Sequence, residues 1–289
     1  EVIVVGGVAP VTTIGLALLF WSLGLGATGI AYAFAITYAL TVPVALYLLS
    51  RVIDLKPLIT GAFHKKPPKG IWSFVVPQNL NMALNRFISS MDVVMLAGFG
   101  VAPGRIAFYA LGAQIVRNGR QVKLIFSGSY APVIARYFHE GRSEELNRLF
   151  STVVGWSISL ALPVLFILAW FRHELLLLFN SSFVQRPDVM LVLLINPFWS
   201  CATGLTGNDI VMAGFSRWNL VNSITVGAAN FGLNLLLIPR YGLWGAAIAT
   251  AIAGSMVAIM QIIEARLLVV IRLPLRTLGP WITIGAALF

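Results

Sequence analysis

The chain has 289 residues, of which 58% are hydrophobic and only 10% are charged, and its mean hydropathy is +0.88. This composition excludes a soluble globular domain. Apolar runs of about 20 residues recur along the sequence, and that is the length of helix that crosses the core of a bilayer. A porin-like barrel would instead show alternating strands of about ten residues. We therefore predict an all-α fold, a polytopic bundle of transmembrane helices.

The apolar runs define eight candidate membrane spans and a ninth that is truncated. They cover residues 2–22, 27–50, 71–99, 105–135, 149–171, 189–213, 218–238, 242–266 and 277–289. A shorter run at 174–179 cannot cross a bilayer and is expected to lie in the interface or to cap a cavity. Because the chain begins with Glu1 and both of its ends are apolar, we expect a fragment that is cut inside membrane segments.

The net charge of +10 could indicate nucleic-acid binding, but the positions of the cations favour a membrane topology instead. Alternating spans place four cation-rich segments on one side of the membrane: 51–70, 136–148, 214–217 and 266–276. The opposite side carries Arg105, Arg172, Arg186 and Arg240. The positive-inside rule then places 51–70 in the cytoplasm. We expect a multi-pass protein of the plasma membrane with no nucleic-acid partner.

Two distant segments are similar in sequence. Residues 23–33 and 241–251 are identical at five of eleven positions, among them the pair Gly24 and Gly242. Both segments form a short outer turn between two spans of the same orientation, which indicates two parallel repeats. The expected domains are the last two helices of a first lobe at 1–50, a basic cytoplasmic loop between lobes at 51–70, a second lobe of six helices at 71–266, and a truncated helix at 277–289.

The third span carries an unusual stripe of polar residues. A 3.6-residue period places five of them on one helical face, namely Gln78, Asn81, Asn85, Ser89 and Asp92. Arg86 lies on a neighbouring stripe near the middle of the span. In the following span Gln114, Arg117 and Gln121 share a face, with Arg120 and Lys123 close by. Antiparallel packing of the two spans would bring their cations to a similar depth.

Burying these cations is expensive. One Arg or Lys in the middle of a membrane costs about 3 kcal/mol, and four cost about 10 kcal/mol unless they face water or partners. Asp92 can neutralise only one, and Asp209 lies near the cytoplasmic end, too far in depth for a partner. We therefore predict a wet cationic cavity for an anionic ligand. The candidate substrate-binding residues are Arg86, Arg117, Arg120, Lys123, Asn85, Gln78, Asn81, Gln114 and Gln121.

Other roles for the polar residues stay open. Each Asn can simply form hydrogen bonds to a neighbouring helix. Arg120 and Lys123 can snorkel, or pair with acids outside this chain. Asp92 is the candidate for ion or proton coupling, although a pair with Arg86 is the expected arrangement. Cys201 lies in an apolar run and is expected to pack there, and the three histidines have no metal-ligand spacing, so we expect neither a metal nor a cofactor.

Several segments resemble a known family. They are YAPVIARYFHEGRSEELNRLF at 130–150, LLLIPRYGLWGAAIATAIA at 235–253, MDVVMLAGFGVAPGRIAFYALGAQI at 91–115 and LLLLFNSSF at 175–183. They are similar to polysaccharide-biosynthesis flippases of the O-antigen type, in the multidrug/oligosaccharidyl-lipid/polysaccharide exporter (MOP) superfamily. The resemblance implies a MATE-like fold with two parallel six-helix lobes around a central cavity.

The resemblance also implies a function and partners. It implies export of a polyprenyl-pyrophosphate-linked oligosaccharide from the cytoplasmic to the outer leaflet by alternating access, in a bacterial or archaeal plasma membrane. Arg86, Arg117, Arg120 and Lys123 would then bind the anionic headgroup. The implied partners are this lipid-linked oligosaccharide, membrane lipids and other polysaccharide-assembly proteins.

Three alternatives remain. A multidrug antiporter of the same superfamily would favour an acidic cavity, and a lipid II flippase would differ only in its substrate. An integral-membrane polymerase or ligase would need catalytic groups in sizeable outer loops, and the sequence contains no nucleophile–base constellation. We therefore expect a transporter rather than an enzyme.

Overall fold

The structure is a computed structural model that describes residues 9–52, 71–179, 187–269, 271 and 279. Within these ranges the secondary structure is helical, with no strand, as the sequence predicts. The chain divides into two compact units, Glu1–Lys69 and Gly70–Phe289. The predicted loop at 51–70 and helix at 277–289 lie outside the described residues, apart from residues 51, 52 and 279.

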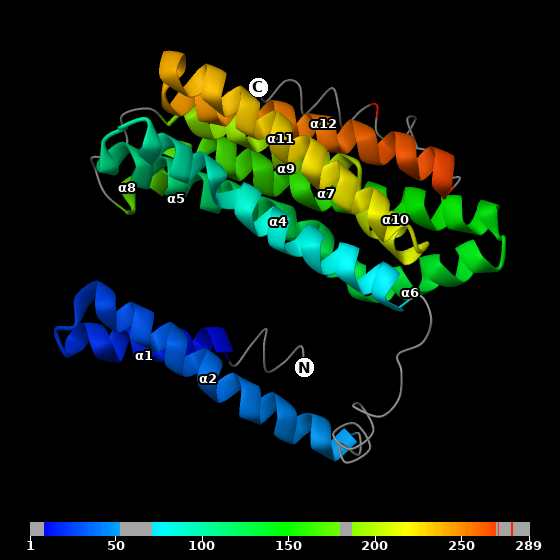
Figure 1. Cartoon of the computed structure of the whole chain (residues 1–289), viewed down its shortest axis with the longest axis horizontal. Helices are drawn as coiled ribbons and strands as arrows, with labels where there is room; N and C mark the ends of the chain where they lie inside the picture. Colours follow the sequence, from blue (N-terminus) through cyan, green and yellow to red (C-terminus); the bar gives the residue numbers. More distant parts are fainter. Residues whose placement is uncertain (1–8, 53–70, 180–186, 270, 272–278, 280–289) are drawn as a thin grey trace. The chain divides into compact units, whose positions relative to one another are not determined.

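The first unit is a helical hairpin. α1 (Ala9–Ser22) packs against α2 (Gly26–Val52), both shown in blue in Figure 1. The reversal between them uses Gly24 and Gly26, whose φ angles are 79° and 52°, a region that glycine enters without steric cost. Large apolar side chains such as Trp21 and Tyr38 are more than 60% exposed. Such exposure is expected of helices that face lipid.

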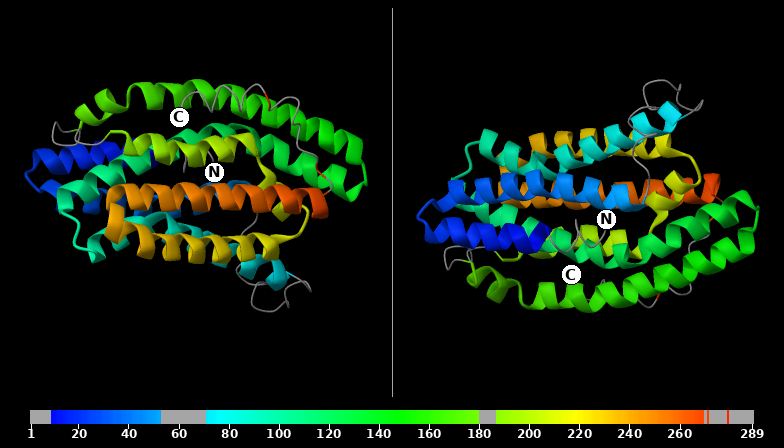
Figure 2. Two further views of the ribbon diagram at one scale, coloured as in Figure 1. Left: turned by 90° about the horizontal axis from the view of Figure 1, so that it is seen from above. Right: turned by 90° about the horizontal axis from the view of Figure 1, so that it is seen from below.

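The second unit is a bundle of long helices that run side by side, as the views in Figures 1 and 2 show. Its elements are α4 (Ile71–Gly98), α5 (Pro103–Gly119), the 3₁₀ helix η2 (Arg120–Lys123), α6 (Leu124–His139), α7 (Ser143–Trp170), α8 (Arg172–Leu177), α9 (Val189–Ala202), α10 (Thr206–Met212), α11 (Ser216–Tyr241) and α12 (Leu243–Leu268). α11 packs against α4 and α12, and α9 packs against α12, α7 and α5. Tyr109, Phe150 and Leu96 are among the largest fully buried side chains. This packing brings α4, α5, α9, α11 and α12 around one interior.

The turn between α11 and α12 resembles the turn of the first unit. Gly242 has a φ angle of 56°, so the aligned pair Gly24 and Gly242 both adopt a left-handed conformation. One turn later, a Cβ atom on Gly245 would collide with the carbonyl oxygen of Leu237. Glycines therefore reverse the chain and let α12 approach α11 closely. The aligned glycines thus share a positive φ angle, and the repeat of two lobes stays a prediction.

Two predicted spans are interrupted. The predicted span 105–135 consists of α5, η2 and α6 and continues to His139, while the predicted span 189–213 consists of α9 and α10, bent by 46°. The second break contains Gly204, whose φ is 65° and where a Cβ atom would come within 2.5 Å of Val154 Cγ2. Neither break was predicted, because each candidate span was defined by a long apolar run, and the polar residues inside that run, such as RQVK at η2, were assigned to a continuous helix.

By length and composition, four described helices can cross a membrane, or five if the bent pair counts as one span: α2, α7, α11, α12, and α9 with α10. The sequence predicts eight spans and a truncated ninth. α4 has 28 residues, but its polar stripe lowers its hydropathy, and η2 divides the span of α5 and α6. The difference thus arises where polar groups or breaks interrupt an apolar run.

Candidate functional site

The polar stripe on α4 faces the interior of the second unit for part of its length. Asn81 and Asp92 are 5% and 8% exposed, so the helical period predicted the buried face correctly at these two positions. Gln78 is half-buried, and its Oε1 atom has no hydrogen-bond partner among the described residues. Arg86, on the neighbouring stripe, is exposed. The same helix therefore carries a buried polar face and an exposed cation.

Asp92 accepts hydrogen bonds from neutral side chains of three other helices. Tyr109 Oη donates to Asp92 Oδ2 over 2.9 Å, and the Thr250 hydroxyl donates to the same oxygen. Asn234 Nδ2 donates to Asp92 Oδ1 over 2.8 Å and to Asn230 Oδ1 over 3.0 Å. Asp92 thereby joins α4 to α5, α11 and α12. A carboxylate with this many donors is stabilised without a cation beside it.

The expected pair between Asp92 and Arg86 is wrong. Both residues are described, and they form no ion pair with each other. They are six residues apart on α4, so a helix places them on different faces. Asp92 points into the bundle, whereas Arg86 is exposed.

A second polar cluster lies nearer the start of α4. Asn85 Nδ2 donates to Asn81 Oδ1 and to Ser223 Oγ, each over 2.9 Å, and Ser223 Oγ donates to Asn81 Oδ1 over 2.5 Å. These bonds join α4 to α11. At this cluster the Asn side chains form hydrogen bonds to a neighbouring helix, which is the alternative role that the sequence left open for them.

A cavity of about 230 Å³ lies beside both clusters. Its lining comes from α4, α5, α9, α11 and α12 and combines polar and apolar side chains. The polar ones are Asn85, Ser89, Asp92, Tyr109, Arg117, Asn196, Ser223, Asn230 and Thr250. This volume suits an ion with its water or a small polar group, rather than a whole lipid-linked sugar.

Arg117 is the cation of this cavity. Its Nη1 atom donates to the backbone oxygen of Ser89 over 2.8 Å, and its Nη2 atom donates to Gln114 Oε1 over 2.8 Å. The guanidinium is therefore fixed across the gap between α5 and α4. Asp92 and Arg117 line the same cavity, so it offers both signs of charge.

Of the other predicted cations whose side chains the structure describes, neither Arg86 nor Lys123 lines the cavity. Lys123 binds Ser200 and Gly204 at the end of α9. The break between α9 and α10 lets α10 bend back toward α6, against which it packs. Gln121 is exposed, and the side chain of Arg120 lies outside the described residues.

Sequence reasoning missed several members of the site. Tyr109 and Asn196 stand alone among apolar residues, so no local pattern marks them. Thr250 lies in a stretch of small residues whose spacing indicated only close packing. Asn230 and Asn234 do share a helical face, and that pattern was a usable signal. Among the described residues no group of three or more His, Cys, Asp or Glu could hold a metal ion.

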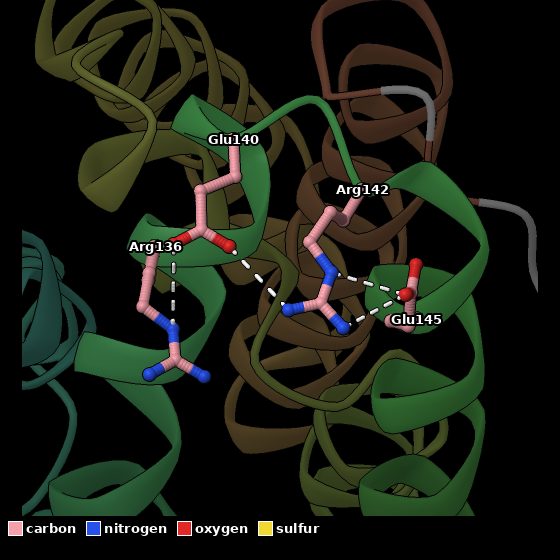
Figure 3. Close-up of polar contacts among 4 residues, drawn as sticks. All are labelled: Arg136, Glu140, Arg142 and Glu145. Carbon is pink, nitrogen blue, oxygen red and sulfur yellow. Dashed lines mark hydrogen bonds and ion pairs between the residues drawn. The ribbon is translucent and has the colours of Figure 1, made fainter.

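A different set of charges lies at the turn between α6 and α7, shown in Figure 3. Arg142 Nη2 lies 2.8 Å from Glu145 Oε1 and its Nη1 atom lies 3.5 Å from Glu140 Oε2, while Arg136 pairs with Glu140 over 3.8 Å. Arg142 also lies over the ring of Tyr137. The hydrogen bonds that Arg142 donates to the Glu145 carboxylate are the main cause that raises the pKa of Arg142. All four charged side chains are 44% to 60% exposed.

The chain was compared with known proteins. No protein-family profile matches it. An uncharacterised membrane protein of Methanocaldococcus jannaschii, MJ1068, is 27% identical over 137 residues, which cover 45% of this chain and 26% of that protein. This likeness and the apolar helices show a multi-pass membrane protein.

Solved structures of transporters share the fold. The lipid II flippase MurJ in its inward closed conformation matches with a TM-score of 0.69 at 13% identity, over 96% of this chain and 59% of that one. The Vibrio cholerae MATE transporter VcmN in its bent form gives 0.60 at 17% identity, over 98% and 64%. A MOP superfamily transporter from Pyrococcus furiosus gives 0.56 at 16% identity, over 78% and 55%. The chain thus spans less than two thirds of each structure, and its fold is the predicted fold of MATE and other MOP superfamily transporters.

Proposed function

We propose that the full-length protein is a flippase that moves a polyprenyl-pyrophosphate-linked oligosaccharide from the cytoplasmic to the outer leaflet. The observation that carries the proposal is Arg117, a cation fixed in a polar cavity inside a lobe of the MATE type. A positioned guanidinium matches the geometry of a phosphate group. The excess of cations over acids on α4, α5 and η2 favours an anionic substrate in the same way.

The mechanism follows from the physics of the substrate. Its headgroup is charged and hydrated, so it requires a wet, polar route, while its lipid tail can stay in the bilayer. Arg117 would bind the pyrophosphate, with Arg86 and the polar residues of α4 beside it, and rocking of two lobes would open the route outward. Moving negative charge out of a cell with a negative interior is favoured by about 2.3 kcal/mol per charge per 100 mV.

Asp92 is the proposed coupling residue. It is buried, lines the cavity and is bound only by neutral donors among the described residues, so a proton or a small cation can neutralise it without displacing a partner cation. Binding there would pull on α4, α5, α11 and α12 together, because the four donors and acceptors come from these elements. Coupling at Asp92 therefore has a direct route to helix movement.

The second candidate is a multidrug or cation antiporter. Asp92 favours it, because a buried carboxylate is the group that a cationic drug or its counter-ion would use. The likeness to MATE transporters is compatible with it. The two candidates differ in which charge of the cavity is essential for recognition, Arg117 or Asp92.

The test replaces single charges in the full-length protein in its own host. Arg117→Ala and Arg117→Glu are each compared with Arg148→Ala, a matched control that removes an exposed cation from the same unit. Surface polysaccharide and lipid-linked precursor on the cytoplasmic side are measured at equal expression. We expect precursor to accumulate in the Arg117 variants alone. Normal export with both Arg117 variants, together with lost drug resistance in Asp92→Asn, would favour the antiporter.

The proposal includes an orientation and partners. The basic segment 51–70 would face the cytoplasm, in the plasma membrane of a bacterium or archaeon, and other polysaccharide-assembly proteins would supply the substrate. A single cysteine placed at Lys66 tests the orientation. A membrane-impermeant thiol reagent should label it in inverted vesicles and not in intact cells.

A further inference from the structure

Two interruptions of membrane helices lie next to each other in the second unit. The first is η2, which replaces one turn of α-helix between α5 and α6. The second is the bend of 46° between α9 and α10. α5 and η2 pack against α9, and α6 packs against α10, so each piece of one broken helix contacts a piece of the other. A movement at one break would therefore displace the elements that form the other.

A break in a helix leaves backbone carbonyls without their usual partners. At the end of α9 the ammonium of Lys123 fills this role. It lies 2.7 Å from Ser200 Oγ, 3.4 Å from the backbone oxygen of Ser200 and 3.3 Å from that of Gly204. A cation at a helix C-terminus is also favoured by the helix dipole. Lys123, the last residue of η2, therefore binds the residues at the break between α9 and α10.

The second half of the broken span carries a carboxylate that faces the same joint. Asp209 of α10 is 1% exposed, and Tyr130 of α6 donates to its Oδ2 atom over 3.2 Å. Its Oδ1 atom has no hydrogen-bond partner among the described residues. This carboxyl group joins α10 to α6 beside the break.

We propose that Lys123 is a positioning residue that locks the two broken spans together, and that it does not bind the transported substrate. Its ammonium holds the end of α9 and the break that leads into α10 through the oxygens of Ser200 and Gly204, while η2 anchors it to the span of α5 and α6. The two bends then move as one joint when the lobe changes shape. The inference does not depend on which substrate the protein carries.

The chain provides its own reporter of this joint. Cys201 is its single cysteine, is buried, and follows Ser200 directly at the end of α9. In the full-length protein in membrane vesicles, the rate of modification of Cys201 by N-ethylmaleimide is measured by mass spectrometry of its peptide. Lys123→Met is expected to raise this rate about tenfold, since it leaves the Ser200 hydroxyl and the backbone carbonyls of Ser200 and Gly204 without their charged donor. Lys123→Arg keeps the charge and several donors, and is expected to stay within about threefold of the unsubstituted protein.

Two further variants separate the lock from other roles. Ser200→Ala removes one hydrogen bond and should raise the rate by only a few-fold, so it decides the matter if Lys123→Met does not accumulate. Arg148→Met, which removes an exposed cation, should leave the rate unchanged.

One result would overturn the proposed role of Lys123 as a lock. If Lys123→Met and Ser200→Ala both leave the labelling of Cys201 unchanged, the lock does not exist. If in addition Lys123→Met abolishes export while Lys123→Arg restores it, Lys123 is a substrate ligand like Arg117. Because labelling is measured without substrate, a failure of the lock and a failure of the proposed flippase function give different results.

Discussion

Two sets of charged residues in the second unit follow opposite rules. At the turn between α6 and α7, Arg136, Glu140, Arg142 and Glu145 pair with each other and remain 44% to 60% exposed. In the bundle, Asp92 is 8% exposed and is surrounded by a phenol, a hydroxyl and an amide instead of a cation. Figure 3 shows the first arrangement, in which each charge keeps contact with solvent.

The difference follows from the dielectric surroundings. Exposed ion pairs add little stability because water already solvates both partners. A buried carboxylate loses its hydration and needs several donors to recover it. Neutral donors leave its net charge uncompensated, so the site can still attract a proton or a cation. The turn therefore depends little on its ion pairs, whereas the hydrogen bonds of Asp92 stabilise the bundle, and the role of Asp92 in transport remains our proposal.

The largest expected effect is at Asp92. Asp92→Ala removes the acceptor of three hydrogen bonds and leaves the donors of Tyr109 and Asn234 buried, which should lower the free energy of unfolding by about 3 kcal/mol. Thermal unfolding of the purified full-length protein in detergent measures this change. Asp188→Ala is the matched control, because Asp188 is an exposed partner of Arg172. Equal effects of the two substitutions would remove the distinction between the two regions.

A smaller effect is expected when one donor is removed. Thr250→Val keeps the shape of the side chain but deletes its hydrogen bond to Asp92, and should cost about 1–2 kcal/mol. Thr152→Val is its control, since Thr152 is exposed and donates only to the backbone oxygen of Arg148 in its own helix. Transport should also shift its dependence on pH or on the coupling ion in Thr250→Val. A change in stability with no change in that dependence would argue against Asp92 as the coupling residue.

The cluster of Asn81, Asn85 and Ser223 should respond more weakly. Ser223→Ala removes one bridge between α4 and α11 but leaves the bond between the two Asn side chains, so about 1 kcal/mol of stability should be lost. Ser255→Ala, in which the lost bond goes to Ala251 of the same helix, should change stability less. If Ser223→Ala lost as much stability as Asp92→Ala, the charge of Asp92 would not explain why the two clusters differ.

The sequence predicted the long helices well and their interruptions poorly. α4 and α12 lie within two residues of the predicted spans, because apolar length and the turns beside them are local signals. α7 begins at Ser143, six residues before its predicted span, because its first turns are polar and lie outside the apolar run. The breaks at η2 and Gly204 depend on contacts with α7 and α9, which no local pattern encodes.

The site was predictable only in part for a related reason. Helical period places Asn81 and Asp92 on one face, and that face is buried. The partners of Asp92 come from positions 109, 234 and 250, so they are set by how three other elements pack. Counting charges suggested Arg86 as the partner, but a helix separates residues six apart onto different faces. Tertiary packing, not composition, decides which polar groups meet.

The smallest effect on stability is expected at the exposed turn between α6 and α7. Arg142→Gln breaks its ion pairs with Glu140 and Glu145, yet thermal stability should not change measurably, because all three groups remain solvated in either form. The unfolding temperature of this variant and of the unsubstituted protein should therefore coincide at low and at high salt. A clear, salt-sensitive loss of stability would show that the network acts as a unit and holds α6 to α7. In that case burial would no longer explain the difference between the two regions.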